Sequence, residues 1–190
     1  HLMPSIDRWV TKAAVDALRV NHPALSRMET ACIGISGQSI NDDRFLEFVV
    51  ELLDEDVDGN RICFDIAEAT LISSIERAHF FIATLKEFGC RVALDDIGLG
   101  VSSFELLKCL QLDYLKIGSS FVRNMTYNSA DYEIVLALSR IAKTLGIRMI
   151  AEGVTTLAAK DSLMGMGVDY VQGFLIDRPH PLSDGRVVTH

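Results

Sequence analysis

Two patterns of apolar residues alternate along this 190-residue chain. Short apolar runs that end at glycine, asparagine or acidic residues are typical of buried strands, and longer segments with apolar residues three or four positions apart are typical of amphipathic helices. The short runs predict six strands, at 30–36, 61–66, 91–96, 113–118, 148–153 and 169–176. The periodic segments predict six helices, at 5–20, from 41 to about 53, and at 71–88, 102–110, 131–145 and 157–166.

Local signals set the ends of several of these helices. Ser5 is the predicted N-cap of the first helix, and Asn41 opens the second. Gly89 and Gly146 follow the third and fifth helices, and glycine commonly ends a helix because it adopts the left-handed conformation freely. These signals place a helix between each pair of successive strands.

The regular alternation of strand and helix predicts parallel βα units. Two architectures have this order, an open doubly wound sheet and a (β/α) barrel of the TIM type. No GxGxxG sequence follows the first predicted strand, which disfavours dinucleotide binding. The residues at the strand ends favour the barrel.

Polar residues stand at or just after the carboxyl ends of five successive predicted strands. They are Asp65, Glu68, Asp95, Asp96, Lys116, Glu152 and Gln172. In parallel strands such side chains converge on one rim, where barrel enzymes build their active sites. Carboxylates with one lysine and no paired cysteines or histidines suit Mg²⁺ or Mn²⁺, and two such ions together promote phosphodiester displacement. Taken singly, Lys116 also fits a rim salt bridge, Glu152 a helix cap and Gln172 a solvated polar group.

The pair Asp95-Asp96 ends the third predicted strand, and a turn with two glycines follows. Successive strand residues point to opposite faces, so one aspartate is expected to face the barrel interior while its neighbour reaches into the next loop. Gly98 and Gly100 are expected to let the backbone turn sharply and leave room for a ligand. A plain strand end with a capping aspartate is the alternative.

Composition narrows the class of protein. A hydrophobic fraction of 49% and a charged fraction of 23% predict one globular domain, and the net charge of −8 argues against DNA or general nucleic-acid binding. No apolar run is long enough to span a membrane, and no signal peptide opens the chain. The four cysteines form no CxxC pair, which predicts free thiols in a reducing cytoplasm.

Five motifs, in order, resemble the EAL-domain family, the barrel phosphodiesterases and receptors of bacterial cyclic di-GMP. Phe64-Asp65-Ile66-Ala67-Glu68 resembles the family's Glu-Ile/Val-Thr-Glu strand, and Asp95 to Ser103 its Asp-Asp-Phe-Gly-Thr-Gly-Tyr-Ser-Ser signature. The others are Leu115-Lys116-Ile117, Ala151-Glu152-Gly153-Val154 and Gln172-Gly173-Phe174. The resemblance runs over essentially all 190 residues and implies a single domain over 1–190.

The resemblance also implies roles for the strand-end residues. In active members, two Mg²⁺ or Mn²⁺ ions and an activated water convert cyclic di-GMP to pGpG. Asp95 would bridge the metals with Asp65 and Asp96 assisting. Lys116 and Glu152 would position or deprotonate the water. The remaining two, Glu68 and Gln172, would support the loop after Asp96 or contact the ligand.

Several positions depart from the family pattern. Gly34 stands where the family has a metal-binding asparagine, and Asp65 replaces a longer glutamate. Gly118 and Thr155 stand where two further carboxylates are expected. The signature loop carries Ile97, Leu99 and Val101 in place of Phe, Thr and an aromatic residue. These departures predict weak or absent hydrolysis.

The sequence begins after the position of the family's Glu-Ala-Leu strand, which predicts an N-terminally incomplete barrel with about six of eight strands. An open sheet edge then favours pairing with another chain, so either a homodimer or poor solubility is expected. Three functions remain open: a weak or inactive cyclic di-GMP phosphodiesterase, a non-catalytic cyclic di-GMP receptor, and a protein-interaction module. Other domains of a parent signalling protein are expected partners.

Overall fold

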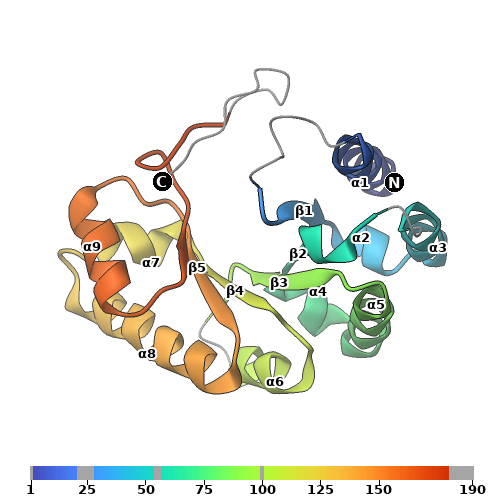
Figure 1. Ribbon diagram of the computed structural model, residues 1–190. Helices are drawn as coiled ribbons and strands as arrows, with labels where there is room; N and C mark the ends of the chain where they lie inside the picture. Colours follow the sequence, from blue (N-terminus) through green and yellow to red (C-terminus); the bar gives the residue numbers. More distant parts are fainter. Residues whose placement is uncertain (1, 21–27, 54–56, 99–100, 180–190) are drawn as a thin grey trace.

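The computed structural model describes residues 2–20, 28–53, 57–98 and 101–179, without the side chains of 101–103. Six parallel strands form one curved sheet in the order of the sequence, which is a half-barrel (Figure 1). They are β1 Ala31–Ile35, β2 Ile62–Ala67, β3 Arg91–Asp95, β4 Tyr114–Ile117, β5 Arg148–Ala151 and β6 Tyr170–Val171. The predicted incomplete barrel is confirmed for these residues.

One helix precedes the first strand and the others follow the strands, and they lie along the outer side of the curved sheet (Figure 1). They are α1 Met3–Arg19, α2 Gly37–Ile40, α3 Asp43–Leu52, α4 Glu68–Ser73, α5 Ile75–Glu87, α6 Val101–Cys109, α7 Ser119–Asn124, α8 Ser129–Leu145 and α9 Leu157–Gly165, with a 3₁₀ turn η2 at Gly59–Arg61. None of the described helices is long and apolar enough to cross a membrane.

The main hydrophobic core lies between the sheet and these helices. Phe64, Leu94 and Leu115 from the strands are fully buried in it. Phe45 of α3 stacks on Phe81 of α5 with ring centroids 6.3 Å apart. Removing this apolar surface from water is the main favourable term in folding and explains the helical periodicity of the sequence.

The concave side of the sheet has a different composition, because alternate strand residues point away from the helices. Cys63, Ala93 and Tyr114 form a second, small buried cluster there, with Ile150 packed against it. The next residues along the strands on this side are polar. The concave side therefore leads from a small apolar layer to the rim where the strands end.

Two predicted helix starts are wrong. Leu2 occupies the N-cap position of α1 and Pro4 stands in its first turn, so Ser5 is already helical. Proline suits the first turn because its missing N–H has no intrahelical partner there. Asn41 ends the short helix α2, and α3 begins after Asp42, whose side chain accepts a hydrogen bond from the Arg44 N–H at 3.1 Å.

Other boundaries also differ from prediction. In place of the helix expected at 71–88, the structure has two helices, α4 and α5. They are separated at Ser74, whose φ of −158° is that of an extended residue. Helix α7 was not predicted, because its six residues are too short to show a period. Strand β6 has only two residues rather than eight, since the chain turns after Val171. Gly89 and Gly146 do have positive φ, of 76° and 74°, as their places after helices predict.

The sheet has two edges in the described residues, β1 and β6. Helix α1 packs against β1, α2 and α3 on the helical side. Its outer face leaves Leu2 and Trp9 more than two-thirds exposed. Pairing of either edge with another chain remains a prediction.

Candidate functional site at the carboxyl ends of the strands

Three carboxylates surround one buried ammonium group where the strands end. Lys116 Nζ lies 2.6 Å from Asp65 Oδ2, 2.5 Å from Glu152 Oε1 and 3.7 Å from Asp95 Oδ1. Four successive strands supply these side chains: β2 carries Asp65, β3 ends at Asp95, β4 carries Lys116, and Glu152 follows β5. We call this group the Lys116 cluster. The structure thus brings together four of the seven residues that the sequence singled out.

The strand geometry explains this convergence. Lys116 lies two residues after Tyr114 on β4, so both point to the concave side. Lys116 is level with Ile150 in the parallel register, which puts Glu152 at the next concave position of the neighbouring strand. The Glu152 N–H also donates to the Ile117 carbonyl at 3.1 Å, which extends the ladder by one residue. The register of the parallel strands therefore fixes the positions of the side chains in the Lys116 cluster.

Burial makes the charges of the Lys116 cluster interact strongly. The side chain of Lys116 is 8% exposed and that of Asp65 is 11% exposed. Burial, together with the charges of Asp95 and Glu152, raises the pKa of Asp65 to about 6, although the hydrogen bond from Lys116 opposes the change. Burial alone would lower the pKa of Lys116, but hydrogen bonds to Asp65 and Glu152 raise it. Lys116 therefore stays charged at neutral pH.

Replacing Asp65 by asparagine is expected to change how stability depends on pH. The pKa of Asp65 rises from its ordinary 3.8 to about 6 on folding, so the folded state holds this proton more tightly. Its contribution to stability is present below pH 4 and is lost as the pH rises through 6. From pH 4 to 7, the free energy of unfolding of the unmodified chain should fall by about 2.4 kcal/mol relative to Asp65→Asn.

Urea denaturation of both proteins across this range measures that difference. A carbon-13 NMR titration of the Asp65 carboxyl group gives the midpoint directly and should place it near 6. A midpoint near the ordinary value of Asp, with parallel stability curves for the two proteins, would contradict the prediction.

The loop after β3 differs from the expected glycine turn. Asp96 is exposed and has φ of 51°, in the left-handed region that few non-glycine residues adopt. Glu68 Oε2 accepts a hydrogen bond from the Gly98 N–H at 2.6 Å. A Cβ atom at Gly98 would lie 3.0 Å from that same oxygen, so the absence of a side chain permits this close approach. The φ angle of Gly98 is not positive, so glycine is not required there by the backbone conformation. Gly100 and Leu99 lie outside the described residues.

Gln172 lies next to the cluster, on the wall of a cleft of about 310 Å³ that also contacts Glu152. Sequence reasoning missed two residues of this cleft, Ser119 and Arg123, and it assigned no role to Phe174, which belongs to one of the family motifs. Arg123 donates to Ser119 Oγ at 2.8 Å, and Phe174 is 64% exposed. The unpredicted helix α7 carries Ser119 and Arg123, so only recognition of this helix would have revealed them.

The donor set does not match a preformed metal site. One oxygen atom of each carboxylate in the Lys116 cluster lies near the ammonium group, and the other Asp65 oxygen, Oδ1, is buried without a hydrogen-bond partner among the described residues. Within the described ranges, no three histidine, cysteine or acidic side chains are arranged to hold a metal ion. Gly34 lies level with Asp65 on β1 and supplies no side-chain donor, although a Cβ there would meet nothing within 4 Å. The metal-ligand roles of Asp65, Asp95 and Asp96 stay predictions.

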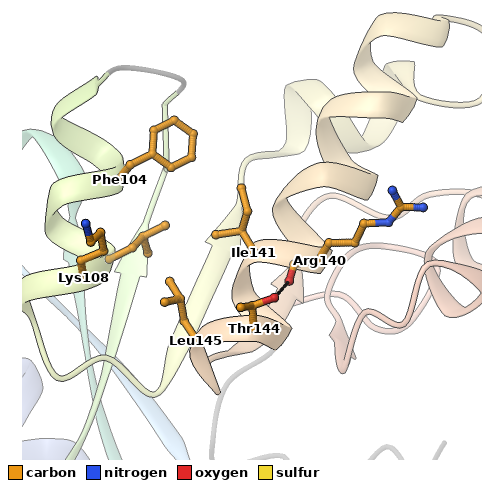
Figure 2. Close-up of a pocket in the computed structure, with 7 residues that line it drawn as sticks. Phe104, Lys108, Arg140, Ile141, Thr144 and Leu145 are labelled. Carbon is orange, nitrogen blue, oxygen red and sulfur yellow. Dashed lines mark hydrogen bonds between the residues drawn. The ribbon is translucent and has the colours of Figure 1, made fainter.

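A second, more apolar groove of about 300 Å³ lies between α6 and α8, away from the Lys116 cluster (Figure 2). Phe104 of α6 faces Ile141 and Leu145 of α8 across it. Arg140 of α8 is exposed at its side. No polar cluster accompanies this groove among its lining residues, so it is not the place where the strand-end chemistry gathers.

Comparison with known proteins agrees with the motifs. The EAL domain family matches residues 1–179. The cyclic di-GMP phosphodiesterase PdeF of Escherichia coli K12 is 33% identical over 184 residues, which cover 96% of this chain and 24% of that protein. The chain therefore spans about a quarter of the length of this relative.

Solved structures share the fold. The EAL domain of Mycobacterium smegmatis DcpA matches with a TM-score of 0.88 at 33% identity, covering 97% of this chain and 83% of that one. The EAL domain of Xanthomonas citri FimX, in complex with c-diGMP, matches with a TM-score of 0.86 at 26% identity, covering 95% of this chain and 71% of that one. This chain, with its half-barrel and strand-end cluster, belongs to the EAL domain family.

Proposed function

We propose that this chain binds cyclic di-GMP at the carboxyl ends of its strands and hydrolyses it slowly or not at all. The observation that carries the proposal is the Lys116 cluster, whose only cation is already shared by Asp65 and Glu152 at 2.6 and 2.5 Å. Family membership and the c-diGMP complex of the FimX domain support the choice of ligand.

Charge determines where the ligand is expected to lie. Cyclic di-GMP carries two phosphodiester anions, and the three carboxylates of the Lys116 cluster outnumber its one ammonium group. The adjacent cleft is more favourable, because Arg123 supplies a positive charge and the exposed Phe174 ring offers a stacking surface for a base. Gln172 there has both donor and acceptor groups for a guanine edge. We infer that the ligand occupies this cleft and contacts the cluster only at Glu152.

The same geometry limits hydrolysis. EAL phosphodiesterases generally depend on divalent metal ions. Here Glu152 could accept a proton from an attacking water, but its carboxylate is held by Lys116 at 2.5 Å. Charge that develops on the phosphate in the transition state meets the Glu152 carboxylate, while the ammonium group of the cluster is already shared by Asp65 and Glu152. Stabilisation of that charge is usually the largest catalytic contribution, so the rate is expected to be low.

We also propose that residues 1–190 form one domain and that it works in the cytoplasm. Buried residues from Val15 of α1 to Met166 after α9 belong to one hydrophobic cluster, which supports a single folding unit. All four cysteines are free thiols, which suits a reducing compartment. Cys63 and Cys90 are buried, whereas Cys32 and Cys109 are exposed.

Binding of cyclic di-GMP, measured by calorimetry in EDTA, tests the proposal. The unmodified chain should bind without added metal, and Gln172→Ala should bind at least about tenfold more weakly, since one lost hydrogen bond in a desolvated site is worth about 1.4 kcal/mol. Gln111→Ala is the matched control, because Gln111 is exposed at the opposite ends of the strands. Absence of binding by the folded, unmodified chain would overturn the proposal and favour the protein-interaction module.

A further inference from the structure

A ladder of arginine and tyrosine side chains lies at the other ends of the strands. Arg91, Tyr114, Arg148 and Tyr170 are the first residues of β3, β4, β5 and β6. Since the strands are parallel, these four residues share the amino-end rim of the sheet, opposite the Lys116 cluster. We call them the amino-end ladder. Nothing in the proposed function uses it.

Hydrogen bonds and ring contacts hold the ladder together. The Tyr114 hydroxyl oxygen accepts from Arg91 Nη1 at 2.6 Å and from Arg148 Nη2 at 2.8 Å. Arg148 Nη1 also donates to the Tyr170 hydroxyl at 3.0 Å, and its guanidinium lies 4.5 Å from the Tyr114 ring centroid. Tyr114 itself is 4% exposed. Two cations are thus fixed around one buried phenol oxygen.

Much of the donor capacity of this ladder is unused. A guanidinium has five N–H groups. Arg91 uses two of them, toward Thr30 Oγ1 and the Tyr114 hydroxyl, and Arg148 uses two toward the tyrosine hydroxyls. Six N–H groups and the Tyr114 O–H therefore have no acceptor among the residues that the structure describes.

No described carboxylate forms an ion pair with either guanidinium group, although the charge of Asp113 acts on Arg91 from a longer distance. Asp113 and Asp169, which precede β4 and β6, have other partners. Asp113 accepts from the Val92 N–H at 2.7 Å and pairs with Lys86. Asp169 accepts from the Met149 N–H at 2.8 Å. Two positive charges with free, preorganised donors therefore remain on one rim of a protein whose net charge is −8.

We propose that Arg91, Tyr114 and Arg148 bind an oxyanion of the phosphate type. A tetrahedral oxyanion supplies the negative charge and the several acceptor lone pairs that this donor set lacks, and arginine forks match it in two-point contacts. The ring contacts fix the guanidinium of Arg148, so little side-chain entropy is lost on binding. The site is independent of the proposed cyclic di-GMP site, which lies at the opposite ends of the strands.

NMR titration of the unmodified chain with inorganic phosphate tests this site. Sodium chloride keeps the ionic strength constant, and the arginine side-chain N–H signals are observed. We expect saturable shifts of the Arg91 and Arg148 signals. Arg148→Gln should weaken phosphate binding at least about tenfold, because one charge-assisted hydrogen bond contributes that much. Arg140→Gln, at the groove between α6 and α8, should leave it unchanged.

A parallel titration with methyl phosphate distinguishes a site for free phosphate from a site for phosphate esters. Only a site that accepts esters will bind methyl phosphate. If Arg148→Gln does not fold, Tyr114→Phe keeps both cations and the ring while removing the shared hydroxyl, and should weaken binding about two- to tenfold. Shifts that grow linearly with phosphate, or that are equal in the unmodified, Tyr114→Phe and Arg140→Gln proteins, would show general screening and overturn the proposal.

Discussion

Replacement of Lys116 by methionine is expected to lower the free energy of unfolding at pH 7.5 by about 3–5 kcal/mol, the range for removing one partner of a buried ion pair. Methionine matches the length of the apolar stem of lysine but lacks the ammonium group. Asp65 and Glu152 would then each lose the ammonium donor that lies 2.6 and 2.5 Å away, respectively. Asp95 would lose its contact with the same cation at 3.7 Å. Three carboxylates would remain close together with no cation between them.

The size of this loss should depend on pH. The pKa of Asp65 is already raised to about 6 in the folded chain, and loss of the ammonium group raises it further. Protonation of Asp65 removes one of the uncompensated charges. Because a raised folded-state pKa favours folding at low pH, the deficit of Lys116→Met should be smaller at pH 5.5 than at pH 7.5.

Urea denaturation at the two pH values measures both effects. Lys12→Met is the matched control, since Lys12 forms only an exposed helical pair with Asp16 at 2.8 Å. Such surface pairs contribute about 0.3–0.5 kcal/mol, so the control should change little at either pH. Equal, small losses in both variants would mean that the Lys116 cluster contributes no more than a surface pair.

Hydrolysis of cyclic di-GMP by the unmodified chain in Mn²⁺ is expected to stay below about 10⁻² s⁻¹, about a thousandfold under the usual enzyme median. Loss of a single transition-state charge interaction lowers rates by about 10²–10³. Gly34 offers no donor, and the carboxylates of Asp65 and Glu152 are held by Lys116. The missing donor at Gly34 and the two carboxylates held by Lys116 all affect the same reacting phosphate, so their effects on the rate combine.

Chromatographic detection of pGpG measures this rate. Glu152→Gln is the control variant: it removes the carboxylate base while keeping the shape of the side chain. Any trace activity that belongs to this site should vanish in it, and activity that persists comes from another source. Turnover near 1 s⁻¹ that Glu152→Gln abolishes would contradict the prediction and make the chain an efficient phosphodiesterase.

Local patterns in the sequence were enough for the order of the strands and for a helix between each pair of them, but not for the short helix α7 or the division between α4 and α5. Apolar periodicity is a property of neighbouring residues, so six strands and the helices between them follow from it. Parallel strands carry their carboxyl ends to one rim, and this rule alone predicts that Asp65, Asp95, Lys116 and Glu152 meet. Family motifs identified the same residues. The weakest local predictions were helix starts, where Leu2 and Asp42 rather than Ser5 and Asn41 hold the cap positions.

The partners of the charged groups depended on distances between strands. The sequence contains the three carboxylates and the lysine, but only the parallel register puts the Lys116 ammonium group between them. The amino-end ladder has the same origin, since Arg91, Tyr114 and Arg148 are far apart in the sequence and meet only because each begins a strand of one sheet. Coulomb and hydrogen-bond energies fall steeply with separation, so spacing along the chain predicts which charges exist, and folding determines which of them pair.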